Sequence, residues 1–554
     1  MSIFDVLTLI GGLCLFLFGM NIMGGALERS AGSKLEIMIG KLTSGKLKGL
    51  LTGLGVTAII QSSSATTVMV VGFVNSKLMD LRQAIHVIMG ANIGTTVTAH
   101  IVSLSGVGGG IDIGAIAAMI GCIGVLSAMF IKNENVAVIG NILGGLGLVF
   151  VGLEVISTYA KLIMFIEGGV PHPVVEKIFR GDHFPLLLVL IGIVLTAMVH
   201  SSSTITSLMV VLASIGVLSF ENALFLALGS NIGTCLTSVM SAIGTQVNAR
   251  RTAIIHLLFN TIGCLIFIAP LWIWGAEVTA LFASMSDDVG QQIAIFHTLF
   301  NVVTTLLMLP FIQWFVKLVC LLVPEGKKQK EKDDTDFTFI DERLFETPAV
   351  AVSNTKFEII KMATIAKENL NLCMDMLYKG EEQNVDLFNK NEHTLNVLNK
   401  KITTYLTKLI ALNLSVNEDN KVGTYFHVVS DIERVGDYAE NIVEYTAKLK
   451  KEDLKLSDEA VEELKEFTKT INDLFNVAIR AFDERNSSLL EEVDKIESSI
   501  DDMCAQLEVK HIDRLKVGIC TAQIGSVYLQ TISNLERVAD HITNVAFSIK
   551  KYHA

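Results

Sequence analysis

The chain lacks the features of most enzymes and of nucleic-acid-binding proteins. Its net charge is −12, and no basic patch interleaved with aromatic residues appears, so nucleic acid is not an expected partner. The eight cysteines form no CxxC pair, which argues against zinc ribbons and thioredoxin-like sites. No nucleophile–base pattern stands out, and no lysine follows Gly144, Gly145 and Gly147 as a phosphate-binding loop would require. We therefore expect a protein that is not an enzyme.

Charged residues are also missing from long stretches of the first half. None occurs from Gly49 to Ser76 or from Phe184 to Phe220, and the whole chain is 51% hydrophobic with a mean hydropathy of +0.52. A membrane-spanning helix needs about 20 mainly apolar residues. The segments that qualify are 3–26, 49–76, 83–104, 113–131, 136–160, 184–218, 222–247, 252–275 and 292–323. Residues 1–323 are thus expected to cross a lipid bilayer several times.

Two polar runs interrupt these apolar segments. Gln61-Ser62-Ser63-Ser64-Ala65-Thr66-Thr67 is followed 139 positions later by His200-Ser201-Ser202-Ser203-Thr204-Ile205-Thr206. At the same offset, Gly90-Ala91-Asn92-Ile93-Gly94-Thr95 returns as Gly229-Ser230-Asn231-Ile232-Gly233-Thr234. A single Ser or Thr in a membrane helix commonly bonds back to its own backbone, but this does not explain a whole run. The first 270 or so residues are therefore a duplicated unit, with repeats at about 5–135 and 138–270.

Each serine-containing segment is longer than one span and polar at its middle. Two half-spanning helices that meet at the serines explain this better than one straight helix, because irregular backbone at membrane depth must be buried in protein or line water. Interrupted segments at matching places in two halves indicate the binding site of a secondary transporter. The candidate binding residues are Gln61, Ser62, Ser63, Ser64, Thr66, Thr67, Asn92, Thr95, His200, Ser201, Ser202, Ser203, Thr204, Thr206, Asn231 and Thr234.

The asparagines and histidines of the expected spans can be explained by helix packing as well as by ligand binding. Asn92 and Asn231 lie beside glycines, where amides often bond across helices to hold the packing. An ionisable group inside a membrane is a functional candidate by default. For His86, His100, His256 and His297 we nevertheless favour neutral rings that bond a neighbouring helix.

The repeated Gln-Ser-Ser-Ser motif resembles that of the type II sodium–phosphate cotransporter family, over roughly residues 1–320. The first copy matches fully, whereas the second has His200 in place of Gln, which leaves the role of position 200 open. The resemblance implies a secondary active carrier of inorganic phosphate with sodium as the coupling ion, and it supports an inverted relation between the repeats. Two alternatives stay open: a phosphate exporter, and a membrane-anchored phosphate sensor that transports nothing.

Positive charges near the ends of the spans predict the orientation in the cell membrane. The 28–48 loop holds Arg29 and four lysines, and several lysines follow the last span from Lys327 onward. By the positive-inside rule both regions are cytoplasmic. The 276–291 loop has acidic residues but no Lys or Arg, so we expect it outside. The protein is thus expected to be a multi-pass protein of the inner or plasma membrane with a cytoplasmic C-terminal part.

Residues 325–347 are a charged linker, and beyond it the apolar residues recur at three- and four-residue spacing. The expected helices are 352–379, 384–413, 421–450, 457–484, 487–514 and 518–551, with breaks at Lys379-Gly380, at 417–420 and before Ser457. Tyr425 to Asn441 matches Tyr528 to Asn544 at an offset of 103. The second half therefore predicts two related three-helix bundles.

The matching segments contain Glu433 with Asp437 and Glu536 with Asp540, each pair on one helix face. With the bundles, this motif resembles the PhoU domain, a regulator of phosphate uptake. The resemblance implies that these four carboxylates hold iron or zinc, and the alternative is an ion-pair lattice with Arg434 and Arg537. Control of the carrier would act through docking or through a homodimer.

The expected fold class is all-α, with a polytopic membrane domain of two repeats at 1–324, a linker at 325–347 and a PhoU-like helical domain at 348–554.

Overall fold

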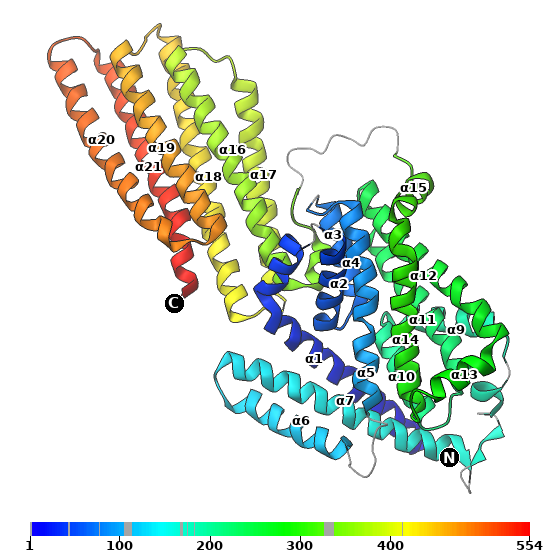
Figure 1. The fold of residues 1–554 in the computed structure, drawn as a ribbon. Coiled ribbons are helices and arrows are strands. Elements are labelled where there is room, and N and C mark those ends of the chain that lie inside the picture. The colour runs from blue at the N-terminus through cyan, green and yellow to red at the C-terminus, as the bar shows by residue number, and fades with distance from the viewer. Residues whose placement is uncertain are drawn as a thin grey trace. The chain divides into compact units, whose positions relative to one another are not determined.

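The computed structural model describes residues 3–42, 45–76, 78–104, 113–166, 170–173, 176–181, 183–325, 337–412 and 414–553. The chain divides into two compact units, Met1–Lys327 and Lys328–Ala554 (Figure 1). Residues 326–336 of the predicted linker lie outside the described residues.

The first unit is built from helices, as predicted. They are α1 (Ile3–Leu42), α2 (Lys46–Ile60), α3 (Ser63–Asn75), α4 (Leu81–Gly94), α5 (Thr96–Ser103), α6 (Ile113–Phe130), α7 (Glu134–Met164), the π-helix η2 (Glu176–Arg180), α9 (Pro185–Val199), α10 (Ser202–Ser214), α11 (Phe220–Ser241), α12 (Val247–Ile273), α13 (Gly275–Ala283), α14 (Val289–Met308), the 3₁₀-helix η3 (Leu309–Phe311) and α15 (Ile312–Leu322). Two-residue strands, β1 (Phe165–Ile166) and β2 (Val170–Pro171), pair antiparallel. This pair does not change the all-α class.

Six segments of the described chain are long and apolar enough to cross a membrane. They are Ile3–Ala31, Leu81–Ser103, Glu134–Met164, Phe220–Ser241, Val247–Ile273 and Val289–Leu322. The segments 49–76 and 184–218 are each split into two shorter helices, α2 with α3 and α9 with α10. The predicted break at each serine run is therefore confirmed.

Two predicted loops contain helix instead. The α1 helix continues through most of 28–48 to Leu42, because charged residues end a membrane span without ending a helix. The 276–291 segment contains α13, whose first turn carries Glu277. An acidic residue there is favourable because it faces the positive end of the helix dipole.

Glycines hold matching helix pairs in close contact in the two copies. A Cβ added at Gly53 of α2 would overlap the carbonyl of Val87 in α4, and one at Gly192 of α9 would overlap the carbonyl of Leu226 in α11. From the opposite side, Gly90 and Gly229 make the same close approach. Small residues let membrane helices approach closely. The glycines beside Asn92 and Asn231 thus fix the distance between these helices and the serine-bearing segments.

The second unit consists of long helices that run side by side (Figure 1). The first bundle is α16 (Pro348–Lys379), α17 (Val385–Ile410) and α18 (Val416–Lys451), preceded by the short 3₁₀-helix η4 (Glu342–Glu346). The second is α19 (Asp458–Glu484), α20 (Leu490–Lys516) and α21 (Ala522–Phe547), with 3₁₀ turns η5 (Ser487–Leu489) and η6 (Ser548–His553). The six predicted helices are therefore present.

The signals that end and start these helices acted as predicted at two of three breaks. Gly380 ends α16 in the left-handed conformation, and Ser457 caps α19 by accepting a hydrogen bond from the Ala460 N–H. The predicted break at 417–420 is wrong. Those residues form the first turn of α18, because Ser415 and Glu418 make a capping box that starts the helix at Val416.

Candidate functional site

The two serine runs adopt the same backbone geometry. Gln61 follows α2 with φ 59° and ψ 21°, and His200 follows α9 with φ 57° and ψ 21°. This left-handed conformation is uncommon for residues other than glycine. It turns the chain so that a second helix starts after one further residue in each copy. Gln61 and His200 are therefore the hinges at which the half-helices meet.

A serine caps the second half-helix in each copy. Ser62 Oγ accepts from the Ala65 N–H at 3.1 Å, and Ser201 Oγ accepts from the Thr204 N–H at 3.2 Å. Ser63 and Ser202 are then the first helical residues, and both are buried. The N-terminus of a helix presents free N–H groups and the positive end of its dipole. Each serine run thus places such an end inside the unit.

The two runs contact each other directly. Ser203 Oγ donates a hydrogen bond to the backbone carbonyl of Gln61 at 3.3 Å, although the residues are 142 positions apart. The second run therefore lies against the hinge of the first. Sequence positions alone could not establish this contact.

Some of the predicted hydroxyls serve local structure. Thr66 Oγ1 donates to the Ser62 carbonyl at 3.0 Å, and Thr67 Oγ1 donates to the Ser63 carbonyl at 2.7 Å. Thr234 Oγ1 donates to the Ser230 carbonyl in the same manner. These three residues show the back-bonding typical of hydroxyls in helices. The hydroxyl of Thr204 donates instead to Ser201 Oγ at 2.9 Å.

Other predicted residues keep buried polar atoms without a partner in the described part of the chain. They include Gln61 Oε1, Thr95 Oγ1, Thr206 Oγ1 and Asn231 Nδ2. A buried polar group without a hydrogen bond costs about 1–3 kcal/mol. The repeated motifs thus contain four buried polar atoms that water or a ligand could satisfy.

The second copy differs from the first at its hinge. Gln61 is buried, with 9% of its surface exposed, whereas His200 is exposed; the serines that follow them, Ser62 and Ser201, are both half-buried. The second copy's hinge therefore faces the surroundings of the unit, while that of the first faces inward. Ser64 in the first run is half-buried.

Asn92 and Asn231 each bond to a histidine of another helix. His256 Nε2 lies 3.4 Å from Asn92 Oδ1, and His297 Nε2 lies 3.2 Å from Asn231 Oδ1. Asn92 and Asn231 therefore make the hydrogen bonds between helices that we gave as the helix-packing explanation for these two residues. It is also the arrangement that we favoured for these histidines, and the role of the asparagines toward a ligand stays a prediction.

The histidines belong to a repeated motif that the sequence analysis missed. Ala253 to Asn260 reads AIIHLLFN in α12, and Ala294 to Asn301 reads AIFHTLFN in α14. Asn260 Nδ2 donates to the His256 carbonyl, and Asn301 Nδ2 donates to the His297 carbonyl. The shared His-x-Leu-Phe-Asn pattern is the signal that would have revealed them. The two copies of the site therefore extend onto α12 and α14.

In the second unit, the predicted carboxylates lie in two acidic clusters. Burial, followed by the charges of Glu440 and Asp437, raises the pKa of Glu392 to about 7. Burial and Asp437 raise the pKa of Glu433 in the same cluster. In the second bundle, burial and then Asp540 raise the pKa of Glu536.

Across the described residues, no group of three or more His, Cys, Asp or Glu side chains is placed to hold a metal ion. The prediction of iron or zinc at Glu433, Asp437, Glu536 and Asp540 receives no support from this geometry. It stays a prediction.

Comparison with known proteins gives consistent results for both units. Residues 15–158 and 176–306 match the family model described as Na+/Pi-cotransporter, and residues 359–446 and 464–549 match the PhoU domain model. Over 309 residues, the chain is 33% identical to "Uncharacterized protein YqeW" of Bacillus subtilis, covering 56% of this chain and 95% of that protein.

Two further relatives have names that state a function. The chain is 25% identical over 550 residues to "Putative inorganic phosphate export protein YjbB" of Escherichia coli, covering 98% of this chain and 97% of that protein. It is 25% identical over 416 residues to "Sodium-dependent phosphate transport protein 2A" of Rattus norvegicus, covering 53% of this chain and 64% of that protein. These relatives are named as transport proteins, not as enzymes.

Proposed function

Because the chain belongs to the Na+/Pi-cotransporter family and carries a PhoU domain, we propose that it is a secondary active transporter that moves inorganic phosphate across the cell membrane with sodium as the coupling ion. The proposed binding residues are those of the two serine runs together with the asparagines and threonines of the Gly-x-Asn-Ile-Gly-Thr motifs. The PhoU-like unit regulates the carrier from the cytoplasmic side.

The contact between Ser203 Oγ and the Gln61 carbonyl is the observation that carries this proposal. It places the second serine run against the hinge of the first, and each hinge precedes a capped helix N-terminus. Helix N-termini bind phosphate well because their N–H groups and dipole favour an anion. Serine hydroxyls at both ends add donors that replace the water around phosphate.

Sodium requires the complementary set of ligands. Unwound backbone carbonyls and helix C-terminal ends coordinate sodium in transporters with broken helices. Here the left-handed hinges follow the C-terminal ends of α2 and α9, so carbonyl groups lie beside the anion donors. The uncharged runs that contain the hinges hold no carboxylate, so neutral oxygens would bind the ion.

Export is the second candidate for the direction of transport. The relatives that match over nearly the whole chain are named as phosphate export proteins. The sodium-dependent relative matches over only 53% of the chain. The presence of both units in the full-length relatives therefore favours export, whereas the repeated motifs are compatible with either direction.

Phosphate flux in proteoliposomes tests the proposal. The purified protein is reconstituted, and radiolabelled phosphate movement is measured with sodium gradients imposed in each direction. We expect flux that follows the sodium gradient and falls in the Ser63→Ala and Ser202→Ala variants. Flux that ignores both sodium and these serines would contradict a coupled carrier, and phosphate binding without any flux would favour the sensor.

A further inference from the structure

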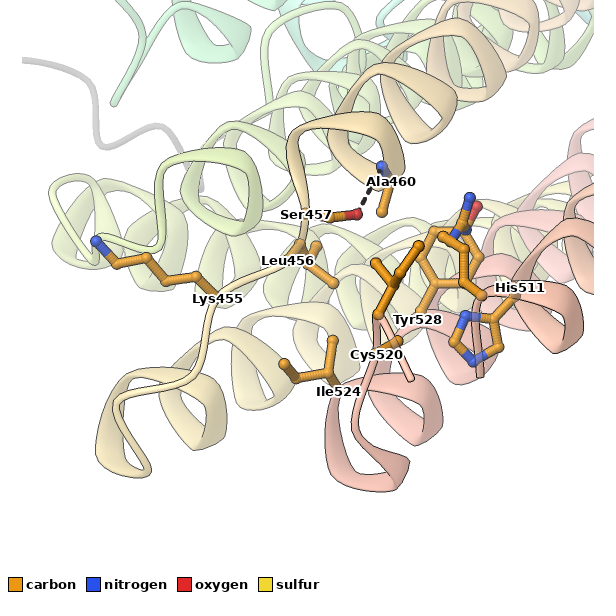
Figure 2. A pocket seen from close by; sticks show the side chains of 10 residues that line it. Lys455, Leu456, Ser457, Ala460, His511, Cys520, Ile524 and Tyr528 are labelled. Atoms are coloured by element: carbon orange, nitrogen blue, oxygen red, sulfur yellow. Dashed lines mark hydrogen bonds between the residues drawn. The ribbon is translucent and has the colours of Figure 1, made fainter. Parts of the chain in front are cut away.

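A pocket lies at one end of the second helical bundle, far in sequence from the serine runs. It has a volume of about 170 Å³, and its walls come from the segment before α19, the end of α20 and the start of α21 (Figure 2). Its polar lining consists of Lys455, Ser457, His511, Arg514, Cys520 and Tyr528. The pocket is therefore bounded by the N-terminal ends of two helices and by two cationic side chains.

Arg514 is buried in the wall of this pocket with unused donor capacity. Only 6% of its surface is exposed. Its Nη2 lies 2.8 Å from Glu463 Oε2, and its guanidinium carbon lies 5.1 Å from the centre of the Tyr528 ring. The Tyr528 hydroxyl also interacts with the guanidinium, but Nη1 makes no hydrogen bond of good geometry in the described part of the chain. A buried guanidinium normally uses its donors, so this one is available to a ligand.

His511 provides a second buried polar atom in the same wall. It is 1% exposed, stacks on Tyr528 with ring centres 5.0 Å apart, and its Nε2 has no partner among the described residues. Burial, then the Arg514 charge, lowers the pKa of His511, so the ring is neutral at pH 7 and can donate one N–H. Arg514 and His511 thus each place a hydrogen-bond donor in the buried wall of the pocket.

The charge balance around the pocket favours an anion. Glu463 is the acidic partner of Arg514, and Lys510 also lies 3.5 Å from it. Lys455 lies on the rim, where Figure 2 shows its side chain extending away from the others. The caps Ser457 and Thr521 begin α19 and α21, whose dipoles point their positive ends at this region. Asp458 and Glu459, in the first turn of α19, are exposed and do not line the pocket.

The first bundle has apolar residues at the positions that correspond to His511 and Arg514. At an offset of 105, buried Phe388 and Leu395 of α17 correspond to buried Val493 and Ile500 of α20. The same offset places fully buried leucines, Leu406 and Leu409, at the positions of His511 and Arg514. Leucines thus fill this part of the core in one copy, whereas the second copy places a histidine and an arginine there.

We propose that this pocket binds a small phosphate-type oxyanion, inorganic phosphate itself, at Arg514 and His511. The choice of phosphate rests on the family to which the chain belongs. The site is separate from the serine runs, so it would let the helical unit sense the substrate without taking part in transport.

Cys520 offers a local probe, because it lines the pocket and is half-buried. The full-length protein in detergent is treated with a maleimide at several phosphate concentrations, and labelling of the Cys520 peptide is followed by mass spectrometry. Bound phosphate should slow labelling by the factor 1 + [phosphate]/Kd, which is about tenfold at nine times Kd. Chloride at the same ionic strength should not protect.

Variants identify where the phosphate binds. Arg514→Gln should weaken the protection constant by about tenfold to 100-fold, the range for a hydrogen bond to a charged group. If this variant fails to fold because Glu463 is left unpaired, the double variant Arg514→Leu with Glu463→Gln removes both members of the ion pair. The separate variant His511→Leu introduces the leucine that the first bundle has at the matching position. Lys455→Gln, on the rim, should have a smaller effect.

The control is Ser63→Ala in the membrane unit, which should leave Cys520 protection unchanged even if transport is lost. Absence of protection by phosphate, equal protection by chloride, or protection that survives in the folded Arg514 and His511 variants would each overturn the proposal. Loss of protection in Ser63→Ala would also overturn it, because the effect would then originate at the serine site.

Discussion

Removing the hydroxyls of Ser63 and Ser202 tests the proposed transport site most directly. These residues are the first helical positions of α3 and α10, with 4% and 3% of their surfaces exposed. The capping bonds come from Ser62 and Ser201, so alanine at positions 63 and 202 leaves both helix caps in place. We therefore expect the two substitutions to change ligand affinity much more than stability.

The expected magnitude follows from a lost hydrogen bond in a buried site. Leaving a buried group without its partner costs about 1–3 kcal/mol, which corresponds to about a 5-fold to 150-fold weaker affinity. If the two runs form one shared site, each substitution should raise the phosphate or sodium concentration needed for half-maximal flux within that range. A stability loss of about 1 kcal/mol is expected instead for Ser62→Ala, because that change removes a cap.

The assay is proteoliposome flux as a function of phosphate and of sodium, with reconstituted protein quantified for each variant. Ser127→Ala in α6 is the matched control, because its hydroxyl only donates to the Gly124 carbonyl of its own helix. Normal flux and affinity in both Ser63→Ala and Ser202→Ala, at normal membrane expression, would refute the site assignment.

Four further changes test other parts of the structure. His200→Gln should be tolerated, because glutamine already occupies the matching left-handed hinge in the first copy; loss of a pH dependence of flux would show instead that His200 titrates. Gly53→Ala should destabilise the protein by about 1–3 kcal/mol through overpacking and lower its melting temperature, whereas Gly25→Ala, with open space around the added Cβ, should not. The native state retains a proton on Glu392 between pH 4.5 and about 7, so metal-free protein should lose up to about 3 kcal/mol of stability as the pH rises through that window. In Glu392→Gln the melting temperature should depend less on pH over the same range. Truncation after Lys327 should leave a carrier with an altered rate; a well-inserted product that binds no phosphate would show that the helical unit is part of the site.

The sequence predicted those elements whose signals are local. The polar run inside an apolar segment predicted the break at Gln61, and the glycine after Lys379 predicted the end of α16. The three- and four-residue periodicity predicted the helices of the second unit because each has a continuous apolar face. At 417–420 the polar composition was misleading, since a capping box can start a helix at Val416 within such a stretch.

Contacts between distant residues could not be predicted in the same way. Nothing in the local pattern around Ser203 indicates that its hydroxyl bonds to the carbonyl of Gln61, because the contact depends on how the two copies pack. The pairing of Asn92 with His256 and of Asn231 with His297 is also a product of packing. The motif around the histidines repeats only 41 positions apart, within the second half of the unit, so a comparison of the two halves does not reveal it.

Duplication gives the chain an internal reference for deciding which polar residues the fold requires. Tyr425 and Tyr528 occupy matching places and are both fully buried, so an aromatic ring there serves the bundle itself. Leu409 and Arg514 also occupy matching places, but burying an ion pair is often no more stabilising than a well-packed apolar core. In the first bundle, buried Glu358 matches Glu463 at the same offset and accepts from the Thr338 and Phe339 N–H groups, so leucine suffices at position 409. In the second bundle Arg514 neutralises Glu463. The same comparison applies to the two hinges. Both have the left-handed backbone, so the fold requires that conformation, but their side chains differ, so the fold does not require a particular side chain at position 200.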